Sequence, residues 1–436
     1  MKRQLGSNER IVYLNIQAGA INFVVVAHLS IPLQQDHVRK ALEILCERHP
    51  LLKTRIAIED GMPWFTSDRV PPISLRVVTR RDDRHWIEEA EHEVNTQLPS
   101  KTGPMIRAVL LTSPEATDVL IRFHHVIGDG MSGMYLMRDL LNLSEKISRG
   151  VSPSVDPFPE RPPIEGLLPP GARGFSDFMK TTSLIGKQLY NITVQRPKKI
   201  PRDSTSPRKE LSAHILHHSF TPEMTERLVN RCREESSTVH GTVCAALLES
   251  VAHHICKRNG YSRSVTVGCM SAVDMRRFLI PPVSEEVGFY ASMVITSHKI
   301  TRNTAFWNLA CEVTESVHHS ISRGEPFVFV SLLGRLVPQN APPSDMAKRA
   351  SEMYPAALLV TNLGRLNIEE DYESLRCKAI HFAVSNKAVP DFFNAALVTY
   401  KGRLIMNFSF NSPILSSEHA TTLADETIDI LNTAIQ

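Results

Sequence analysis

The apolar positions near the start of the chain switch from the period of a strand to the period of a helix. Ile21 to Leu29 is almost continuously apolar or β-branched, which predicts a buried strand. From Asp36 to Leu45 the apolar side chains recur at positions i, i+3, i+4 and i+7 of a helix. We expect Asp36 to be the N-cap of this helix and Pro50 to follow its end.

A second pair of strands flanks a turn. The runs Ile106–Leu111 and Val119–Phe123 are apolar, and residues 113–118 between them are typical of turns. The second run leads directly into His124-His125-Val126-Ile127-Gly128-Asp129-Gly130. A helix is expected next, with one apolar face formed by Met134, Met137 and Leu141.

Prolines then gather between Ser148 and Arg173, at positions 153, 157, 159, 162, 163, 169 and 170. This density predicts a linker or an extended crossing segment. A second irregular stretch runs from Arg196 to Arg202. We therefore divide the chain into an N-terminal lobe, residues 1–175, and a C-terminal lobe, residues 176–436.

The second lobe alternates strands and helices again. Strands are predicted at Leu211–Phe220, Val265–Gly268, Val287–Thr296, Ala356–Thr361, Ala395–Tyr400 and Leu404–Phe410, and helices from Thr221 and at Thr238–Ile255, Asn303–Ser322 and Ser416–Ile435. Lys401-Gly402-Arg403 is a hairpin turn. Hairpins in both lobes are weak support for an internal duplication.

Composition and charge exclude several classes of function. The chain has 436 residues, enough for two or three domains, and its 49 basic and 46 acidic residues leave a net charge of +3. Such a balance gives no global signal for nucleic acid. No window approaches the roughly 20 apolar residues that span a bilayer, and no signal peptide opens the sequence. We expect a cytoplasmic protein, with peripheral membrane contact left open.

The cysteines indicate neither a metal site nor a disulfide framework. Their number is seven, which is odd, and none lies in a CxxC pair. Buried free thiols in a reducing compartment are the simplest interpretation.

Chemistry is indicated most strongly by residues 124–130. A histidine at a strand end, followed by a glycine-containing turn, projects into a cleft from a rigid support. Its ordinary pKa, about 6.5, suits a general base near neutral pH. Three other His-His pairs, at 217–218, 253–254 and 318–319, lack the following Asp-Gly and are interpreted as surface or partly buried histidines.

His124-His125-x-x-x-Asp129-Gly130 resembles the HHxxxDG motif of the condensation-domain and CoA-dependent acyltransferase superfamily, which includes polyketide-associated and alcohol acyltransferases. Other segments resemble that superfamily in the same order along most of the chain: Arg48–Arg55 (RHxxLR), Asp274–Arg277 (a structural arginine), Val287-Gly288-Phe289 (VGxF) and Thr361–Gly364 (NLG).

The resemblance implies an α+β fold (an α/β sandwich): two chloramphenicol-acetyltransferase-like lobes in a V, with a tunnel through their interface. His125 would be the catalytic base, and Asp129 would be structural, paired with Arg276. His124 and Gly130 would complete the motif. It implies no metal and no permanently bound cofactor, and acyl-CoA or acyl-phosphopantetheine would be the co-substrate.

The sequence also departs from its relatives. The DFGWG segment of the plant branch is absent, and Asp391-Phe392-Phe393-Asn394 is only weakly similar to it. Ala291-Ser292 stands where condensation domains usually have an asparagine, which makes amide formation less secure. Ser292 and Asn362 are our candidate substrate-binding residues. Asn362 has an equally good alternative reading, in which it only shapes the turn before Gly364.

The function expected is therefore acyl transfer from a CoA or carrier-protein thioester to a hydroxyl, with His125 as general base, in natural-product or lipid biosynthesis. No serine or cysteine lies in a nucleophile-elbow pattern, so no acyl-enzyme is required. The basic stretch Arg196–Lys209 could attract CoA phosphates or an acyl carrier protein, or be a solvated loop. Two alternatives stay open: a free-standing amide-forming condensation enzyme with an amine acceptor, and a non-catalytic binding module.

Overall fold

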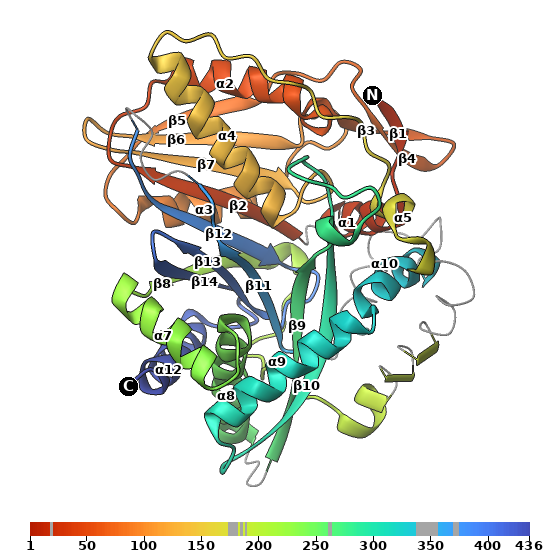
Figure 1. Ribbon diagram of the computed structural model, residues 1–436, viewed down its shortest axis with the longest axis vertical. Helices are drawn as coiled ribbons and strands as arrows, with labels where there is room; N and C mark the ends of the chain where they lie inside the picture. The colour runs from red at the N-terminus through yellow and green to blue at the C-terminus, as the bar shows by residue number, and fades with distance from the viewer. Residues whose placement is uncertain are drawn as a thin grey trace.

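The computed structural model describes residues 1–17, 21–172, 182–183, 186–187, 190–259, 264–336, 356–368 and 375–436. Figure 1 shows two lobes, the N-terminal one at the top in red to yellow and the C-terminal one below in green to blue. Each lobe combines a sheet with helices, so the expected α+β fold is confirmed. No helix of the described residues is long and apolar enough to cross a membrane.

The N-terminal lobe is built on a sheet with the strand order β12-β2-β7-β6-β5. Its strands are β12 (Cys377–Asn386), β2 (Ile21–Leu29), β7 (Thr117–His124), β6 (Ile106–Thr112) and β5 (Ser74–Thr79). The helices α2 (Gln35–Arg48) and α4 (Gly130–Ser148) cover one face, and α3 (His85–Asn95) covers the other.

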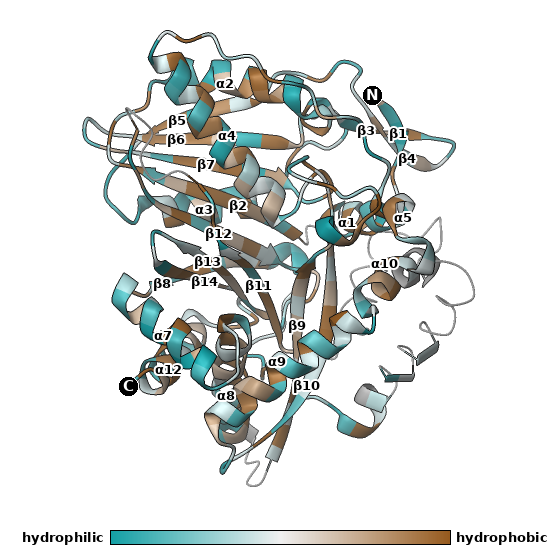
Figure 2. Cartoon of the chain, in the orientation of Figure 1, coloured by the Kyte–Doolittle hydropathy of each residue, from teal (hydrophilic) through white to brown (hydrophobic). Residues whose placement is uncertain are grey.

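Both faces of β2 are buried because side chains on alternate positions enter different cores. Phe23, Val25 and Ala27 pack with α2 and α4, whereas Val24 and Val26 pack with α3. The nearly continuous apolar run of the sequence is therefore what a central strand covered on two sides requires. Figure 2 shows these strands in brown beneath helices with teal outer faces.

The C-terminal lobe has a sheet with the strand order β10-β9-β11-β13-β14-β8. The strands are β10 (Ala291–Thr301), β9 (Ser264–Asp274), β11 (Leu358–Arg365), β13 (Phe393–Tyr400), β14 (Arg403–Ser412) and β8 (Ser212–Ser219). The helices α7 (Pro222–Glu234), α8 (Val239–Asn259), α9 (Phe306–Ser322) and α12 (Ser417–Ala434) pack on one face of it.

Smaller elements join the lobes or edge them. They are β1 (Lys2–Gln4), α1 (Ser7–Gln17), β3 (Arg55–Glu59), β4 (Met62–Thr66), α5 (Ile164–Leu167) and α10 (Glu325–Leu336). The proline-rich stretch crosses between the lobes as expected. The backbone of Phe158 bonds Arg48 in the first lobe, and Arg161 pairs with Glu286 in the second.

The strand β12 belongs by sequence to the C-terminal half but lies in the sheet of the N-terminal lobe. It pairs antiparallel with β2, Phe382 opposite Val25. The sheets therefore do not divide the chain at one point, and the division at residue 175 stays a prediction about folding units. The sequence analysis did not predict this strand.

A row of side chains fastens β12 to the second lobe. On β14, Asn407, Ser409 and Asn411 alternate along the strand, so all three lie on one face. They donate hydrogen bonds to the carbonyls of Phe382, Val384 and Asn386, respectively. These bonds satisfy backbone oxygens at the edge of the first sheet, where no further strand pairs.

Two expected boundaries differ. The helix α2 has Gln34 as its N-cap, and Asp36 lies in its first turn, so the prediction of Asp36 as the cap was wrong. The strand predicted from Val287 begins at Ala291, because residues 286–290 turn away from the sheet to contact the N-terminal lobe.

Candidate active site

His125 follows the last residue of β7 and lies between the lobes. Its ring meets Phe23 of the first lobe edge-on at 5.0 Å between centroids, and Phe289 of the second at 5.3 Å. Nδ1 is 2.8 Å from the carbonyl oxygen of Gly128. A carbonyl can only accept, so Nδ1 carries the proton in the neutral ring and Nε2 has the free lone pair.

Burial sets the charge of this ring. It lowers the pKa of His125, and the Gly128 carbonyl and the Asp129 carboxylate offset this only in part. A lowered pKa leaves the imidazole neutral at pH 7, which is the state a general base needs. The residue nevertheless keeps some solvent-accessible surface.

His124 has a different environment. It is 1% exposed, and burial lowers its pKa to about 3. Its ring stacks on Tyr13 at 6.4 Å. Because His124 is the last residue of β7 and His125 starts the turn, the two side chains leave the strand differently. His124 therefore packs within the first lobe, and His125 faces the interface.

Asp129 opens α4 as its N-cap. The carboxylate accepts a hydrogen bond from the Ser132 amide at 2.9 Å, so its negative charge sits at the positive end of the helix. The same carboxylate forms two contacts with Arg276 of the second lobe, at 2.9 Å and 3.0 Å. The predicted ion pair is confirmed, and both groups are almost fully buried.

The ion pair allows Asp129 and Arg276 to stay charged although both side chains are buried. Arg276 and the surrounding amides lower the pKa of Asp129 despite its burial. The Arg276 guanidinium also bonds Asp274 and the Ser132 hydroxyl, and it lies over the ring of Tyr290. Pairing of both terminal nitrogens of Arg276 is what makes its buried charge tolerable. Asp129 thus orients the turn, whereas the His125 ring bonds the Gly128 carbonyl.

Residues 286–290 of the second lobe touch the motif region along their whole length. The amide of Val287 donates to His49 Nδ1, and the Tyr290 amide donates to Asp129. Between them, Gly288 exchanges two bonds with the Ser132 hydroxyl, at 2.9 Å and 3.1 Å. The segments that resembled RHxxLR and VGxF thus meet at the lobe interface beside His125.

Gly130 is required by close packing. A Cβ at this position would lie 2.9 Å from Leu363 and 3.1 Å from Phe382. Leu363 belongs to the NLG segment on β11, and Phe382 belongs to the crossing strand β12. The motif is therefore enclosed by elements from three parts of the chain.

The two candidate substrate-binding residues make structural contacts. Asn362 accepts a hydrogen bond from the Gly364 amide at 2.8 Å, and Gly364 has φ +73°, so the turn-shaping reading is supported. Ser292 is buried and donates to the carbonyl of Pro326 at 2.7 Å. A contact of either residue with substrate stays a prediction.

The structure also places the remaining features predicted from the sequence. Asp391 holds Arg202 and Lys199 of the basic stretch, so part of that stretch is neutralised within the protein. The histidines of the other His-His pairs are partly or fully exposed, as expected. Within the described ranges, the side chains form no group of three or more metal ligands. The tunnel itself stays a prediction.

Phe23, Ser132 and Tyr290 were missed from sequence. Ser132 and Tyr290 act through atoms that contact the other lobe, so no local pattern marks them. Phe23 reads as an ordinary core residue in an apolar strand.

Comparison with known proteins supports this arrangement. A family model of the condensation domain matches residues 14–160, which contain the histidine motif. A second model, the C-terminus of phthiocerol/phthiodiolone dimycocerosyl transferase, matches residues 209–409, which contain Arg276 and residues 286–290.

Curated relatives are large multienzymes. The nonribosomal peptide synthetase penN of Penicillium thymicola is 23% identical over 92% of this chain, which spans 14% of that protein. The probable nonribosomal peptide synthetase CymA of Salinispora arenicola is 24% identical over 68% of the chain, which spans 4% of it. The chain thus corresponds to a small part of each.

Solved structures share the fold over the whole chain. Polyketide synthase associated protein 5 from Mycobacterium tuberculosis has a TM-score of 0.70 at 17% identity, covering 99% of this chain and 98% of its own. The TRI3 trichothecene 15-O-acetyltransferase from Fusarium sporotrichioides has a TM-score of 0.77 at 13% identity, covering 100% and 96%.

Proposed function

The chain belongs to the superfamily of condensation domains and related acyltransferases, and from this premise we propose that it transfers an acyl group from a thioester to a hydroxyl, with His125 as general base. The observation that carries the proposal is the bond from His125 Nδ1 to the Gly128 carbonyl. It leaves Nε2 as the basic atom of a neutral imidazole at the lobe interface.

The reaction then needs two proton transfers, both through His125, and no covalent enzyme intermediate. Nε2 of His125 takes the proton of the acceptor hydroxyl as its oxygen attacks the thioester carbonyl. The tetrahedral intermediate collapses with loss of the thiolate, which recovers the proton. General-base catalysis contributes about 10²–10⁴-fold, and positioning supplies part of the remainder.

The negative charge of the intermediate requires donors. The N–H groups that open α4 at Gly130 lie at the positive end of a 19-residue helix, beside His125. Of these groups, the Ser132 amide is occupied by the Asp129 carboxylate, which is also paired with Arg276, so the amides of Gly130 and Met131 are the proposed donors. We assign the oxyanion to this helix start.

The donor is proposed to be an acyl-CoA or an acyl-phosphopantetheine on a carrier protein. Both carry the same thioester at the end of the same long arm, and a base placed between two lobes suits a donor and an acceptor arriving separately. Natural-product biosynthesis is the setting in which the relatives named above act, and we propose it here too.

A second function is favoured by one specific observation. The match to the condensation domain includes the motif, and the curated relatives are peptide synthetases. Amide formation with an amine acceptor would use the same base and the same oxyanion site.

The experiment is a matrix of donors and acceptors read by mass spectrometry. Purified protein is incubated with acyl-CoAs and acyl carrier proteins, each with alcohols and with amines, and His125→Ala serves as the blank. Ester products that require His125 are expected. Amide products alone would replace the first function by the second, and equal product with His125→Ala would overturn both.

A further inference from the structure

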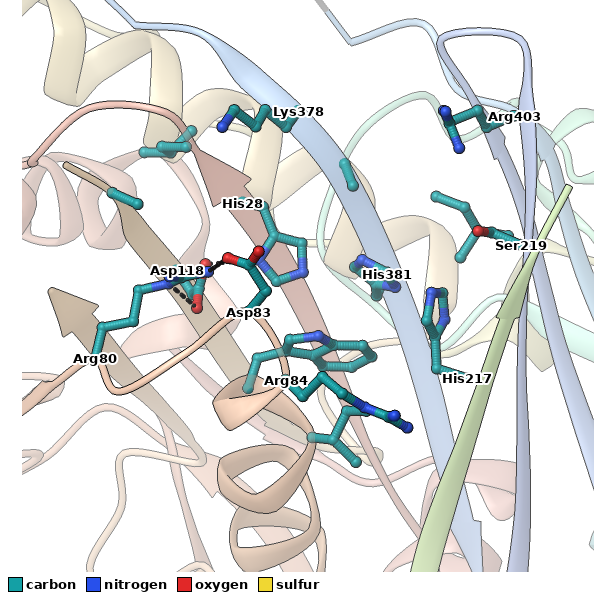
Figure 3. A pocket seen from close by; sticks show the side chains of 16 residues that line it. His28, Arg80, Asp83, Arg84, Asp118, His217, Ser219, Lys378, His381 and Arg403 are labelled. Atoms are coloured by element: carbon teal, nitrogen blue, oxygen red, sulfur yellow. Dashed lines mark hydrogen bonds and ion pairs between the residues drawn. The ribbon is translucent and has the colours of Figure 1, made fainter. Parts of the chain in front are cut away.

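A hollow lies between the lobes, on the opposite face of the first sheet from α4. It encloses about 400 Å³ and is lined from both lobes: by β2, β12 and the start of α3, and by β8 and β14 (Figure 3). His381 and Phe382 are neighbours on β12, so they point to opposite faces. His381 lines the hollow, and Phe382 packs against Phe23 beside the motif.

The wall of the hollow is a cluster of aromatic nitrogen rings. The His381 ring lies 4.6 Å from that of His28, 4.7 Å from that of His217 and 4.3 Å from that of Trp86. His28 is held by Asp118 at 2.6 Å, and His217 is held by Asn407 at 2.9 Å. These oxygens fix two of the rings.

His381 differs from its two neighbours. It is 4% exposed, yet its Nδ1 has no hydrogen-bond partner among the residues described. Leaving a buried polar atom unpaired costs about 1–3 kcal/mol. Nδ1 is itself shielded from solvent, so a ligand in the hollow would reach it only after the ring turns.

The charge around the hollow is positive. Its lining holds four cations and two carboxylates: Arg80, Arg84, Lys378 and Arg403 against Asp83 and Asp118. Arg80 bonds both carboxylates, at 2.7 Å to Asp83 and 2.8 Å to Asp118. Arg80, Asp83 and Asp118 together carry one net negative charge. The three positive charges of Arg84, Lys378 and Arg403 exceed it.

Three exposed cations thus remain at the rim. Arg84 and Lys378 come from the first lobe and Arg403 from the second; none forms an ion pair within the described ranges. Arg84 is also the N-cap residue of α3, so the positive end of that helix faces the same hollow.

We propose that this hollow binds a small molecule carrying phosphate groups. Guanidinium groups of Arg84 and Arg403 present paired N–H donors that match phosphate oxygens, and the Lys378 ammonium adds a third positive charge at the rim. The volume, about 400 Å³, is of the size that holds small organic ligands. The site is separate from the proposed acyl transfer, because the sheet lies between it and His125.

The ligand would also hold the lobes together. Its contacts come from both lobes, and the adjacent Phe382 reaches Phe23 and the space over Gly130. Occupancy therefore stabilises the arrangement in which the two halves of the motif region meet.

The test uses inorganic pyrophosphate as the probe, with binding followed by tryptophan fluorescence and by the melting temperature. Saturable binding and a higher melting temperature are expected for the full chain. The double variant Arg84→Ala/Arg403→Ala should raise the dissociation constant by about tenfold or more, as loss of charged hydrogen bonds implies. Both side chains are exposed, so the fold is retained.

The matched control removes two exposed cations elsewhere. Arg39→Ala/Lys40→Ala on α2, at the other face of the sheet, should bind pyrophosphate as the wild type does. Absence of saturable binding at millimolar pyrophosphate, or equal weakening by the control, would overturn the proposal. Citrate binding as tightly as pyrophosphate would overturn the assignment to phosphate.

Discussion

Asp129 and Arg276 face each other across the two lobes, joined by two hydrogen bonds of 2.9 Å and 3.0 Å. One member caps the helix that begins at the motif, and the other stands 147 residues further along the chain. The pair therefore fixes the second lobe against the turn that carries His125. An acidic residue next to the proposed base can in this way affect the rate without touching substrate.

Replacement of Arg276 should act through the fold. Arg276→Ala leaves the Asp129 carboxylate buried without its cation, which costs about 3–5 kcal/mol. We expect the free energy of unfolding in urea to fall by that amount, and turnover to fall with it. The exposed neighbour provides the control: Arg277→Ala should change stability by less than about 0.5 kcal/mol. Equal losses in the two variants would refute the interpretation.

Replacement of His125 should act on the chemistry. His125→Ala should lower turnover by at least about 10², the lower range for a lost general base, with an unchanged circular dichroism spectrum. The comparison is His124→Gln, which alters a packed side chain and should reduce stability more than turnover. A His125→Ala protein with near wild-type turnover would contradict the mechanism.

Acid should destabilise the protein through His124. Its pKa is about 3 in the fold, because of burial, against about 6.5 unfolded, so the unfolded state binds the extra proton between those values. Stability is therefore full above pH 6.5 and is lost as the pH falls toward 3, by about 1.4 kcal/mol per unit from this group. His124→Gln should flatten the pH dependence of the unfolding free energy by that slope, and exposed His318→Gln should not.

The sequence predicted the motif and its buried partner because both lie in short contiguous patterns. His125 and Asp129 share one turn, and Arg276 follows a strand in a segment of its own. The long strands and amphipathic helices were also predictable, since period and length separate them. Ala291 begins β10 four residues later than expected, because apolar Val287 is buried, and Phe289 partly buried, against the other lobe instead.

What the sequence did not predict depends on contacts between distant segments. The strand β12 has no regular alternation of apolar and polar positions, and no local signal tells which sheet it enters. The histidines of the hollow between the lobes come from β2, β8 and β12, and only the fold brings them together. Ser132 is unremarkable in sequence, and its hydroxyl bonds Gly288 only after the lobes meet.

Gly130 should be sensitive to one added methyl group. Gly130→Ala places a Cβ 2.9 Å from Leu363, and overpacking of this kind costs about 1–3 kcal/mol. Leu363→Ala removes the obstructing atoms, so the double variant should lose less than the sum of the single losses, as a double-mutant cycle measures. The control Gly171→Ala has nothing within 4 Å and should be tolerated. If the two losses of stability add, a contact other than the one with Leu363 causes the loss in Gly130→Ala.

The seam between β14 and β12 should contribute stability through individual hydrogen bonds. Ser409 is buried and donates to the carbonyl of the partly buried Val384, so Ser409→Ala leaves that carbonyl without its donor. That loss costs about 1–3 kcal/mol.

The chain provides a matched control for that variant in Ser144, which is equally buried but whose hydroxyl has no partner within the described residues. Ser144→Ala removes an unsatisfied polar atom, so it should be neutral or slightly stabilising. Urea unfolding of both variants separates the hydrogen bond from the burial of a hydroxyl. If Ser409→Ala loses no more stability than Ser144→Ala, apolar packing of β12 holds the seam between β14 and β12. The side-chain hydrogen bonds would then only set the register.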